Sequence, residues 1–297
     1  MSEGVGLLGE PADWLAPFLS EVVKAPVLVA LVGAMAAAYF GAWGAQRMIS
    51  RDQQRQAVVA ELNAISAALS LCFNISNVFI SLKGQFVRPM HGRFLDGEAA
   101  LRQFQAQTAR SRSPFKWQAD FRTVPLVFAP TEFLQTTVLE KIGMRGLGVD
   151  ALIRLKASEI GLAQTINQRT EAIALVGAET SETLKVRRYF GVSLPNGDVD
   201  ERFADALRGI VQQTDDCIYF SYYLARELTK YGDALRLKYK DRWGWRLPKL
   251  QQLDWKDAHE KKLIPPDEEY KAWSRAFVKI PSRWEKARLK LSAWRKR

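Results

Sequence analysis

The residues of this chain that could do acid–base or metal chemistry are few and scattered. Asp215 and Asp216 are adjacent, lie close to Tyr219, Tyr222 and Tyr223, and could hold a metal ion or move a proton. The pattern around them is helical, however, and adjacent side chains on a helix point about 100° apart, so the pair cannot readily chelate one ion. We therefore interpret both carboxylates as solvated charges beside an aromatic core face.

Other reactive residue types lack the partners that catalysis needs. His91 follows Pro89 in what reads as a surface loop, and no motif supplies a partner for it. Cys72 and Cys217 lie far apart in helical patterns and give neither a disulfide framework nor a metal-ligand spacing. The sequence also lacks nucleophile motifs and a phosphate-binding glycine loop. We expect no catalytic activity, no metal, no cofactor and no small-molecule substrate.

The C-terminal segment, residues 243–297, indicates a different chemistry, the binding of anions. Residues 236–297 contain 19 Lys+Arg against 8 Asp+Glu, which is the whole net charge of +11, and six of the 9 tryptophans. A basic amphipathic helix with tryptophans suits an anionic membrane surface or a nucleic-acid backbone. The alternative is that the tryptophans pack on the rest of the protein and the charges face water. The candidate binding residues are Trp284, Lys286, Arg288, Lys290, Trp294, Arg295, Lys296 and Arg297.

Residues 25–47 form an apolar stretch that needs an element of its own. The 19 residues of 27–45 carry no charge, and as a helix they would be about 29 Å long, close to the hydrocarbon thickness of a bilayer. The stretch starts late and follows an acidic segment, which argues against a secretory signal. We therefore predict a retained transmembrane helix over residues 25–47.

The charges on either side of this stretch predict its orientation. Arg47, Arg51 and Arg55 follow it, whereas the preceding residues are mostly acidic. Because basic residues near the ends of a span stay in the cytoplasm, residues 1–24 should be a short extracytoplasmic tail. Residues 12–23 of that tail have the spacing of an interfacial helix. The predicted location is the cell (inner or plasma) membrane, crossed once, with the C-terminal domain in the cytoplasm.

Small residues gather on one side of the predicted span. On a helical wheel Gly33, Ala37, Gly41 and Ala45 form a ridge, opposite most of the large side chains. Helices in a bilayer associate through close backbone approach at such residues. The ridge predicts that the chain self-associates or pairs with another membrane protein.

The residues after the span predict a cytosolic helical bundle over 48–242. Apolar stripes indicate one long helix that ends before Pro89, a second that ends near Gly191 and a third that begins near Asp198 or Asp200. If these helices alternate in direction, the turn at residues 195–197 lies near the membrane and the C-terminal segment begins at the far end of the bundle.

A small cap, residues 89–131, interrupts the helical pattern. Proline and glycine punctuate it, and Phe115, Trp117, Ala119 and Phe121 alternate with polar residues, as is typical of a strand. We expect an irregular cap that contains a strand, followed by a short helix over residues 131–142. The predicted fold class is mainly α: a transmembrane helix, a bundle of long antiparallel helices and this cap.

These features predict a single-pass, membrane-anchored, self-associating helical interaction or scaffold protein. Two alternatives stay open. One is a membrane-tethered basic module that binds nucleic acid or anionic lipid through the C-terminal segment. The other is a membrane-perturbing effector of an antiviral or toxin-like kind, whose assembled spans would disturb the bilayer.

Overall fold

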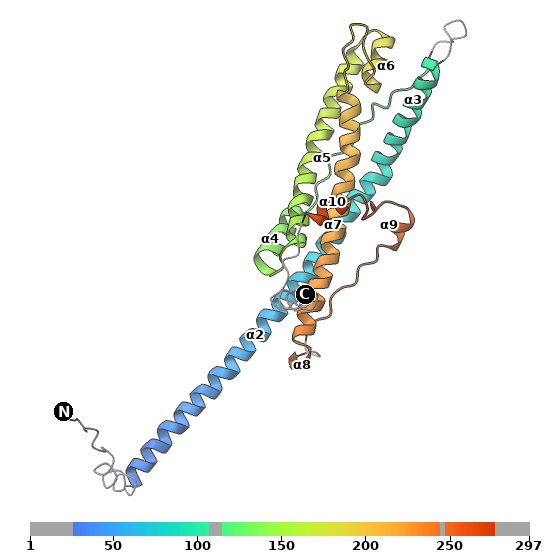
Figure 1. Ribbon diagram of the computed structural model, residues 1–297. Coiled ribbons are helices and arrows are strands. Elements are labelled where there is room, and N and C mark those ends of the chain that lie inside the picture. Colours follow the sequence, from blue (N-terminus) through green and yellow to red (C-terminus); the bar gives the residue numbers. More distant parts are fainter. Residues whose placement is uncertain (1–25, 107–114, 244–246, 277–297) are drawn as a thin grey trace, which may run out of the picture. The chain divides into compact units, whose positions relative to one another are not determined.

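A computed structural model describes residues 26–106, 115–243 and 247–276 of the chain (Figure 1). They belong to two compact units, unit 1 up to Val58 and unit 2 from Val59 onward. The described residues are mainly helical, as predicted, and contain no strand. Helix α2, Pro26–Leu82, contributes to both units, and the described part of unit 1 belongs entirely to this helix.

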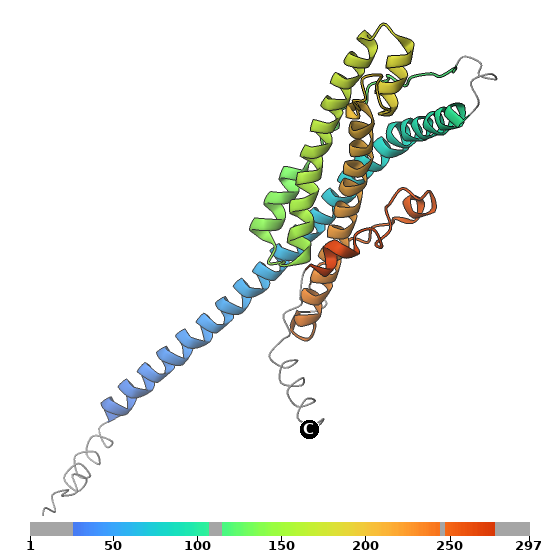
Figure 2. The same cartoon turned by 45° about the horizontal axis from the view of Figure 1, so that its top comes forward.

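The first limb of unit 2 consists of the end of α2 and the helical residues that follow it up to Ala106. It continues past Pro89, whereas the sequence pattern predicted that the helix ends before this residue. A π-helical turn, Lys83–Val87, and then α3, Arg88–Ala106, follow α2 without a break. Proline has no N–H for the carbonyl four residues earlier, and its ring crowds the preceding turn, so it usually ends or kinks a helix. The wider π turn takes up this misfit, and the helix changes direction there (Figure 2).

The second limb consists of the irregular residues 115–130 and α4, Thr131–Lys141. The strand predicted here is wrong, because the segment pairs with side chains rather than with another strand. The buried guanidinium group of Arg169 donates hydrogen bonds to the carbonyls of Asp120 (2.8 Å) and Arg122 (2.7 Å), and the backbone N–H of Asp120 donates to the hydroxyl of Tyr189 (3.2 Å). The alternating pattern marks an extended segment that lies against helices.

The third and fourth limbs are long helices. α5 covers Leu147–Ala178 and is separated from α6, Glu182–Phe190, at the place where the sequence predicted one uninterrupted helix. α7 covers Arg202–Lys238 and is followed by the short α8, Lys240–Trp243. α5 and α7 lie side by side (Figure 1). Their approach is close at Gly209, where a Cβ atom would lie 2.8 Å from Cγ2 of Thr165.

The core of unit 2 lies between α2, α5 and α7. The apolar stripes of the sequence are buried there, because each helix turns the same face toward its neighbours. The buried residues include Leu62, Ile65, Leu69, Cys72, Ile75 and Phe79 of α2, Leu152, Leu155, Leu162 and Ile166 of α5, and Phe203, Leu207, Ile210, Leu224 and Leu228 of α7. A polar pair crosses this core, since the Oγ atoms of Ser76 and Ser221 lie 2.6 Å apart.

The directions of the limbs differ from the prediction. The Tyr231 hydroxyl near the end of α7 donates a 2.6 Å hydrogen bond to Glu61, while Phe203 at the start of α7 contacts Phe94 of α3. α7 is therefore antiparallel to the first limb. The turn at residues 195–197 lies at the α3 end of unit 2, and α7 returns to the end where the chain enters this unit. The prediction failed because residues 115–141 already bring the chain back before α5 begins.

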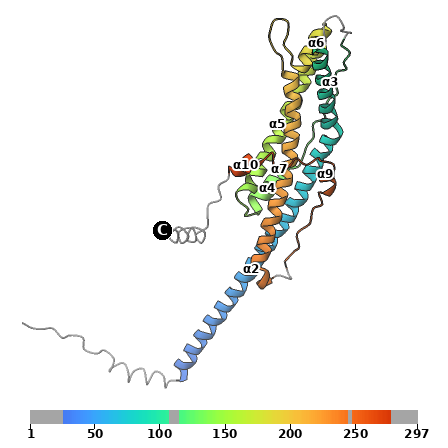
Figure 3. The same cartoon turned by 45° about the vertical axis from the view of Figure 1, so that its right-hand side comes forward.

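Residues 247–276, which we call the C-terminal clasp, cross α7 from one side to the other (Figure 3). The clasp contains two short helices, α9 (Lys256–Glu260) on the side of α2 and α3, and α10 (Lys271–Arg275) on the side of α5. Lys83 of the π turn anchors the crossing, because its ammonium group lies 2.6 Å from Oδ1 of Asp215 and donates to the carbonyl of Leu263 at 3.1 Å.

Candidate functional site

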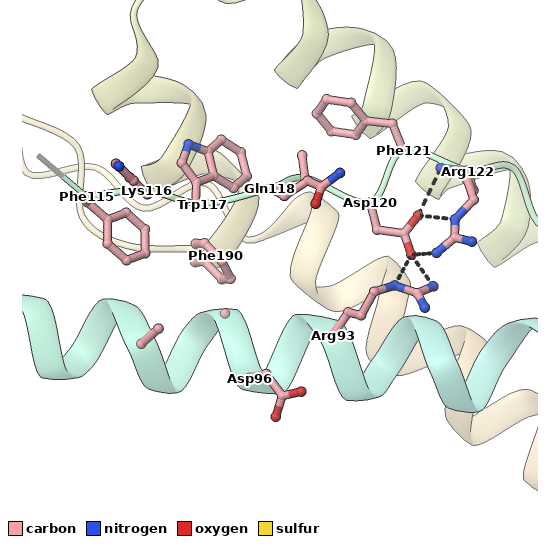
Figure 4. A pocket seen from close by; sticks show the side chains of 13 residues that line it. Arg93, Asp96, Phe115, Lys116, Trp117, Gln118, Asp120, Phe121, Arg122 and Phe190 are labelled. Carbon is pink, nitrogen blue, oxygen red and sulfur yellow. Dashed lines mark hydrogen bonds and ion pairs between the residues drawn. The ribbon is translucent and has the colours of Figure 1, made fainter.

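A groove of about 790 Å³ lies between α3 and the extended segment of residues 115–122 (Figure 4). We call it the α3 groove. It is lined by Arg93, Asp96, Gly97, Ala100, Phe115, Lys116, Trp117, Gln118, Ala119, Asp120, Phe121, Arg122 and Phe190. Phe190 is buried, and it packs so closely on α3 that a Cβ atom at Gly97 would lie 2.9 Å from Cζ of this ring. The groove therefore has an apolar part that depends on small residues of α3.

One end of the α3 groove is charged. The Asp120 carboxylate accepts hydrogen bonds from Nε of Arg93 (2.8 Å) and from Nε (3.0 Å) and Nη2 (3.3 Å) of Arg122. Its side chain is 7% exposed, whereas those of Arg93 and Arg122 are 45% and 72% exposed. Asp120 thus fixes two guanidinium groups that remain open to solvent.

The ionisation of Asp120 follows from these contacts. Burial alone would raise the pKa of Asp120, but the hydrogen bonds from Arg122 and Arg93 outweigh it and lower the pKa to about 2. Behind the carboxylate, burial lowers the pKa of the Arg169 guanidinium, with Asp120 and Tyr189 opposing the shift. The carboxylate is therefore charged at neutral pH, and the guanidinium groups of Arg93, Arg122 and Arg169 compensate its negative charge.

No pattern in the sequence marks these charged residues. The alternation of residues 115–121 predicts a strand instead. Two of the three arginines around Asp120 come from distant parts of the chain, since Arg93 is 27 residues away and Arg169 is 49 residues away. No spacing in a single sequence connects groups at such distances, and only the long-range fold brings them together.

The structure gives Asp215 and Asp216 separate partners. Asp215 is paired with Lys83, whereas Asp216 accepts a 2.7 Å hydrogen bond from the hydroxyl of Tyr270. Burial raises the pKa of Asp216, and the Tyr270 hydrogen bond opposes this rise. Both carboxylates hold neighbouring segments, so their interpretation as solvated charges is wrong. Over the described ranges, no three His, Cys, Asp or Glu residues are placed to hold a metal ion.

The histidine and the cysteines of the sequence analysis lie within helices. His91 is part of α3 and not of a loop, because the helix continues through this region. Cys72 and Cys217 are free thiols and fully buried. Burial raises the pKa of both thiols, which disfavours the reactive thiolate. None of the three belongs to the α3 groove.

Aromatic rings attach the C-terminal clasp to the bundle. Tyr270 stacks on Tyr219 with ring centroids 3.6 Å apart, and Trp273 meets Phe220 edge-on at 5.1 Å. The indole N–H of Trp273 also donates a hydrogen bond to Asp150 at the start of α5 (2.5 Å).

The other arm of the clasp is attached in the same way. Trp255 lies between Phe73 of α2 and Tyr222 of α7, with ring centroids 5.3 and 5.2 Å away. Two of the six tryptophans of the basic C-terminal region, Trp255 and Trp273, therefore pack on the bundle.

The ridge predicted to pack in a membrane lies on the helical surface of unit 1. Gly33, Ala37, Gly41 and Ala45 are all exposed on α2, and a Cβ atom at Gly33 or Gly41 would meet nothing within 4 Å. Beside them lie exposed large apolar side chains, which are Val29, Leu31, Val32, Met35, Tyr39, Phe40, Trp43, Met48 and Ile49. Among the described residues, one helix, starting at Val29, is long and apolar enough to cross a membrane by length and composition.

The predicted anion-binding residues lie outside the described part of the chain. This applies to Trp284, Lys286, Arg288, Lys290, Trp294, Arg295, Lys296 and Arg297, and also to the predicted extracytoplasmic tail, residues 1–24.

Comparisons of the chain with protein-family models, with curated proteins and with solved structures gave no match.

Proposed function

We propose that the protein is a single-pass, membrane-anchored helical interaction protein that self-associates through its span and holds unit 2 in the cytoplasm. The observation that carries this proposal is the surface of α2 in unit 1. There, large apolar side chains such as Met35 and Phe40 are 59% and 66% exposed, and no other residue in the described part of the chain covers them. Exposure of such an apolar surface to water is unfavourable, whereas in a membrane the lipid tails would cover it.

An interaction role is further supported by exposed apolar residues on unit 2. Phe128 and Phe133 flank Pro130 at the start of α4 and are 89% and 73% exposed, and Leu126 nearby is 46% exposed. Neighbouring exposed apolar side chains of this size favour contact with another protein. They belong to the second limb, whereas the ridge of small residues belongs to unit 1.

Self-association is tested by enlarging the ridge. Gly41→Leu places a branched side chain where close backbone approach is proposed, so the oligomer in mild detergent should dissociate. The measurement is the mass of the full-length protein by analytical ultracentrifugation. Val32→Leu, on the opposite side of the span, is the matched control and should leave the mass unchanged. A Gly41→Leu protein with the wild-type mass would show that the ridge does not carry the assembly.

A second candidate function is contact of the basic C-terminus with anionic lipid. It is favoured by the position of the clasp, which ends with Trp273 against Asp150, near the start of α5. The chain also enters unit 2 in the half that contains the start of α5. Glu61 lies just after the start of unit 2, and it accepts a hydrogen bond from the backbone N–H of Gly143, which lies just before α5. The last described residues of the clasp, 274–276, therefore lie in the half of unit 2 that contains Glu61.

This second function is tested in proteoliposomes. Phosphatidylserine in the vesicles should slow proteolytic removal of residues 277–297, because each Lys or Arg near an anionic surface contributes about 1 kcal/mol. Added salt should reverse the effect. Replacing Lys286, Arg288 and Lys290 by serine should abolish the protection.

The matched control replaces three exposed lysines of the clasp, Lys256, Lys261 and Lys271, by serine and should leave the protection intact. Equal cleavage rates with and without phosphatidylserine would contradict lipid binding.

A further inference from the structure

We propose that the surface of α5 and α7 beneath residues 263–276 is a peptide-recognition site that also accepts this segment from a second copy of the chain. In the structure the site is occupied by the chain's own segment, which is the later part of the C-terminal clasp and includes α10 (Figure 3). The contact lies wholly in unit 2. It goes beyond the proposed self-association, because it does not involve the span.

The bundle holds this segment as proteins hold bound peptides, by side chains that contact a short linear stretch. In the described part of the chain, the backbone–backbone hydrogen bonds of residues 263–276 all stay within the clasp. The bundle contributes side chains instead. Lys83 donates to the carbonyl of Leu263 at 3.1 Å, and Arg226 lies 2.9 Å from the Asp267 carboxylate. Because no helix or strand is shared, the segment can leave and rebind without unfolding the core.

Two aromatic side chains, three residues apart, anchor the segment. Tyr270 stacks on Tyr219 with ring centroids 3.6 Å apart, and its hydroxyl donates a 2.7 Å hydrogen bond to Asp216. Trp273 is buried, and its indole N–H donates to Asp150. Each anchor combines burial of a ring with a hydrogen bond to a carboxylate, so the site favours a tyrosine and a tryptophan over other apolar residues.

The bundle side of the contact indicates what the occupant must be. Departure of the segment would expose Tyr219 and Phe220, and the part-buried carboxylate of Asp216 would lose the hydroxyl that now donates to it. Such a surface is unfavourable in water. It requires two rings and two donors at the spacing of Tyr270 and Trp273, and a second copy of the chain carries this segment. Two copies that exchange their segments keep every one of these contacts, as in domain swapping.

The test uses a fluorescent synthetic peptide of residues 261–276 and the full-length Trp273→Ala protein in mild detergent. This substitution removes an anchor from the protein's own segment and leaves the site on α5 and α7 unchanged. Fluorescence anisotropy should show saturable binding of the peptide. Binding should be at least about ten-fold tighter than to the wild type, whose tethered segment already occupies the site. A peptide with Tyr270→Ala and Trp273→Ala should not bind.

Lys271→Ala is the matched protein control, because it changes an exposed residue of the same segment. It should bind the peptide as weakly as the wild type. Asp150→Ala, added to the Trp273→Ala protein, removes the acceptor of the indole N–H and should weaken peptide binding about ten-fold. Thermal unfolding of each variant near the wild-type temperature confirms that it folds.

The second copy is tested as a competitor. The full-length Asp150→Ala protein has an intact segment and a weakened site of its own, so it should displace the labelled peptide from the Trp273→Ala protein. The protein with both substitutions has no intact segment and should not displace it. The proposal is overturned if the peptide shows no saturable binding, if the doubly substituted peptide binds equally well, or if the Asp150→Ala protein displaces nothing. Because the peptide contains no residue of the span, none of these failures would contradict self-association through the span.

Discussion

At the scale of single residues, Asp120 is the charge that holds the second limb in place. It lies among Arg93, Arg122 and Arg169, and all three contact the carboxylate or the backbone beside it. A buried carboxylate in water-poor surroundings is costly unless it is paired, and removing a paired charge leaves its partners uncompensated. The stability of the extended segment should therefore depend on this one side chain.

Asp120→Asn tests this dependence. The pKa of Asp120 is lowered from 3.8 to about 2, so its charged form stabilises the fold by about 2 kcal/mol at neutral pH. This contribution is fully present above pH 3.8 and is lost as the pH falls toward 2. The gap between wild type and variant in urea unfolding should accordingly be about 2 kcal/mol at pH 7 and should narrow below pH 4.

The control for this prediction is Asp205→Asn, which removes an exposed carboxylate that pairs with Arg208 three residues later. An exposed pair of this kind contributes about 0.5 kcal/mol, so the control should lose far less stability. If both variants lose the same free energy, or if the Asp120→Asn gap is constant with pH, Asp120 does not have the role described.

At the scale of elements, the clasp is attached to the outside of the bundle by aromatic ring contacts and side-chain hydrogen bonds. Its α10 arm is held chiefly by Tyr270 and Trp273, and Trp273 is 8% exposed. Removing a buried tryptophan typically costs about 3–5 kcal/mol. Because the clasp lies outside the core between α2, α5 and α7, this cost should appear as local opening rather than as global unfolding.

Trp273→Ala should therefore speed amide hydrogen exchange in residues 263–276 at least about ten-fold, while exchange in α5 and the core of α7 stays slow. The measurement is hydrogen–deuterium exchange with peptide-level mass spectrometry. Lys271→Ala, an exposed position on the same short helix, is the control and should exchange like the wild type. Loss of protection throughout α5 and α7 would instead make the clasp part of the core.

The elements also show what a single sequence can and cannot predict. The apolar stripes of α2, α5 and α7 mark the helices because burial follows the helical period over many turns. Pro89 misled the prediction, because the π turn at Lys83–Val87 that accommodates it has no recognisable composition. Residues 115–121 misled it as well, because an extended segment and a strand share the same period and differ only in their distant partners.

At the scale of the whole molecule, Glu61 ties three limbs together at the entry end of unit 2. Its Oε1 atom accepts hydrogen bonds from the Tyr231 hydroxyl at 2.6 Å and from the backbone N–H of Gly143 at 2.8 Å. One side chain of α2 therefore binds α7 and the connection between α4 and α5. The sequence alone could not predict the directions of the limbs, because hydrogen bonds between residues so far apart in the chain follow only from the fold.

Glu61→Ala should lower the free energy of unfolding of unit 2 by about 2–3 kcal/mol, because two donors lose a charged acceptor. The measurement is urea unfolding of the full-length protein, followed by circular dichroism. Glu182→Ala removes a carboxylate that is 72% exposed at the other end of the unit, and this control should change stability by less than about 1 kcal/mol. A Glu61→Ala protein as stable as the control would show that the entry end is held by apolar packing alone.

The order of the chain gives the clasp a consequence during synthesis. α7 precedes the clasp, so its aromatic residues Tyr219 and Phe220 leave the ribosome before Tyr270 and Trp273, which later cover them. A nascent or prematurely terminated chain that lacks Trp273 would therefore display an uncovered aromatic surface of the kind that chaperones and proteases recognise. Synthesis of the clasp would hide this surface. Chains translated through Trp273 would therefore conceal the aromatic residues of α7, whereas shorter fragments would expose them.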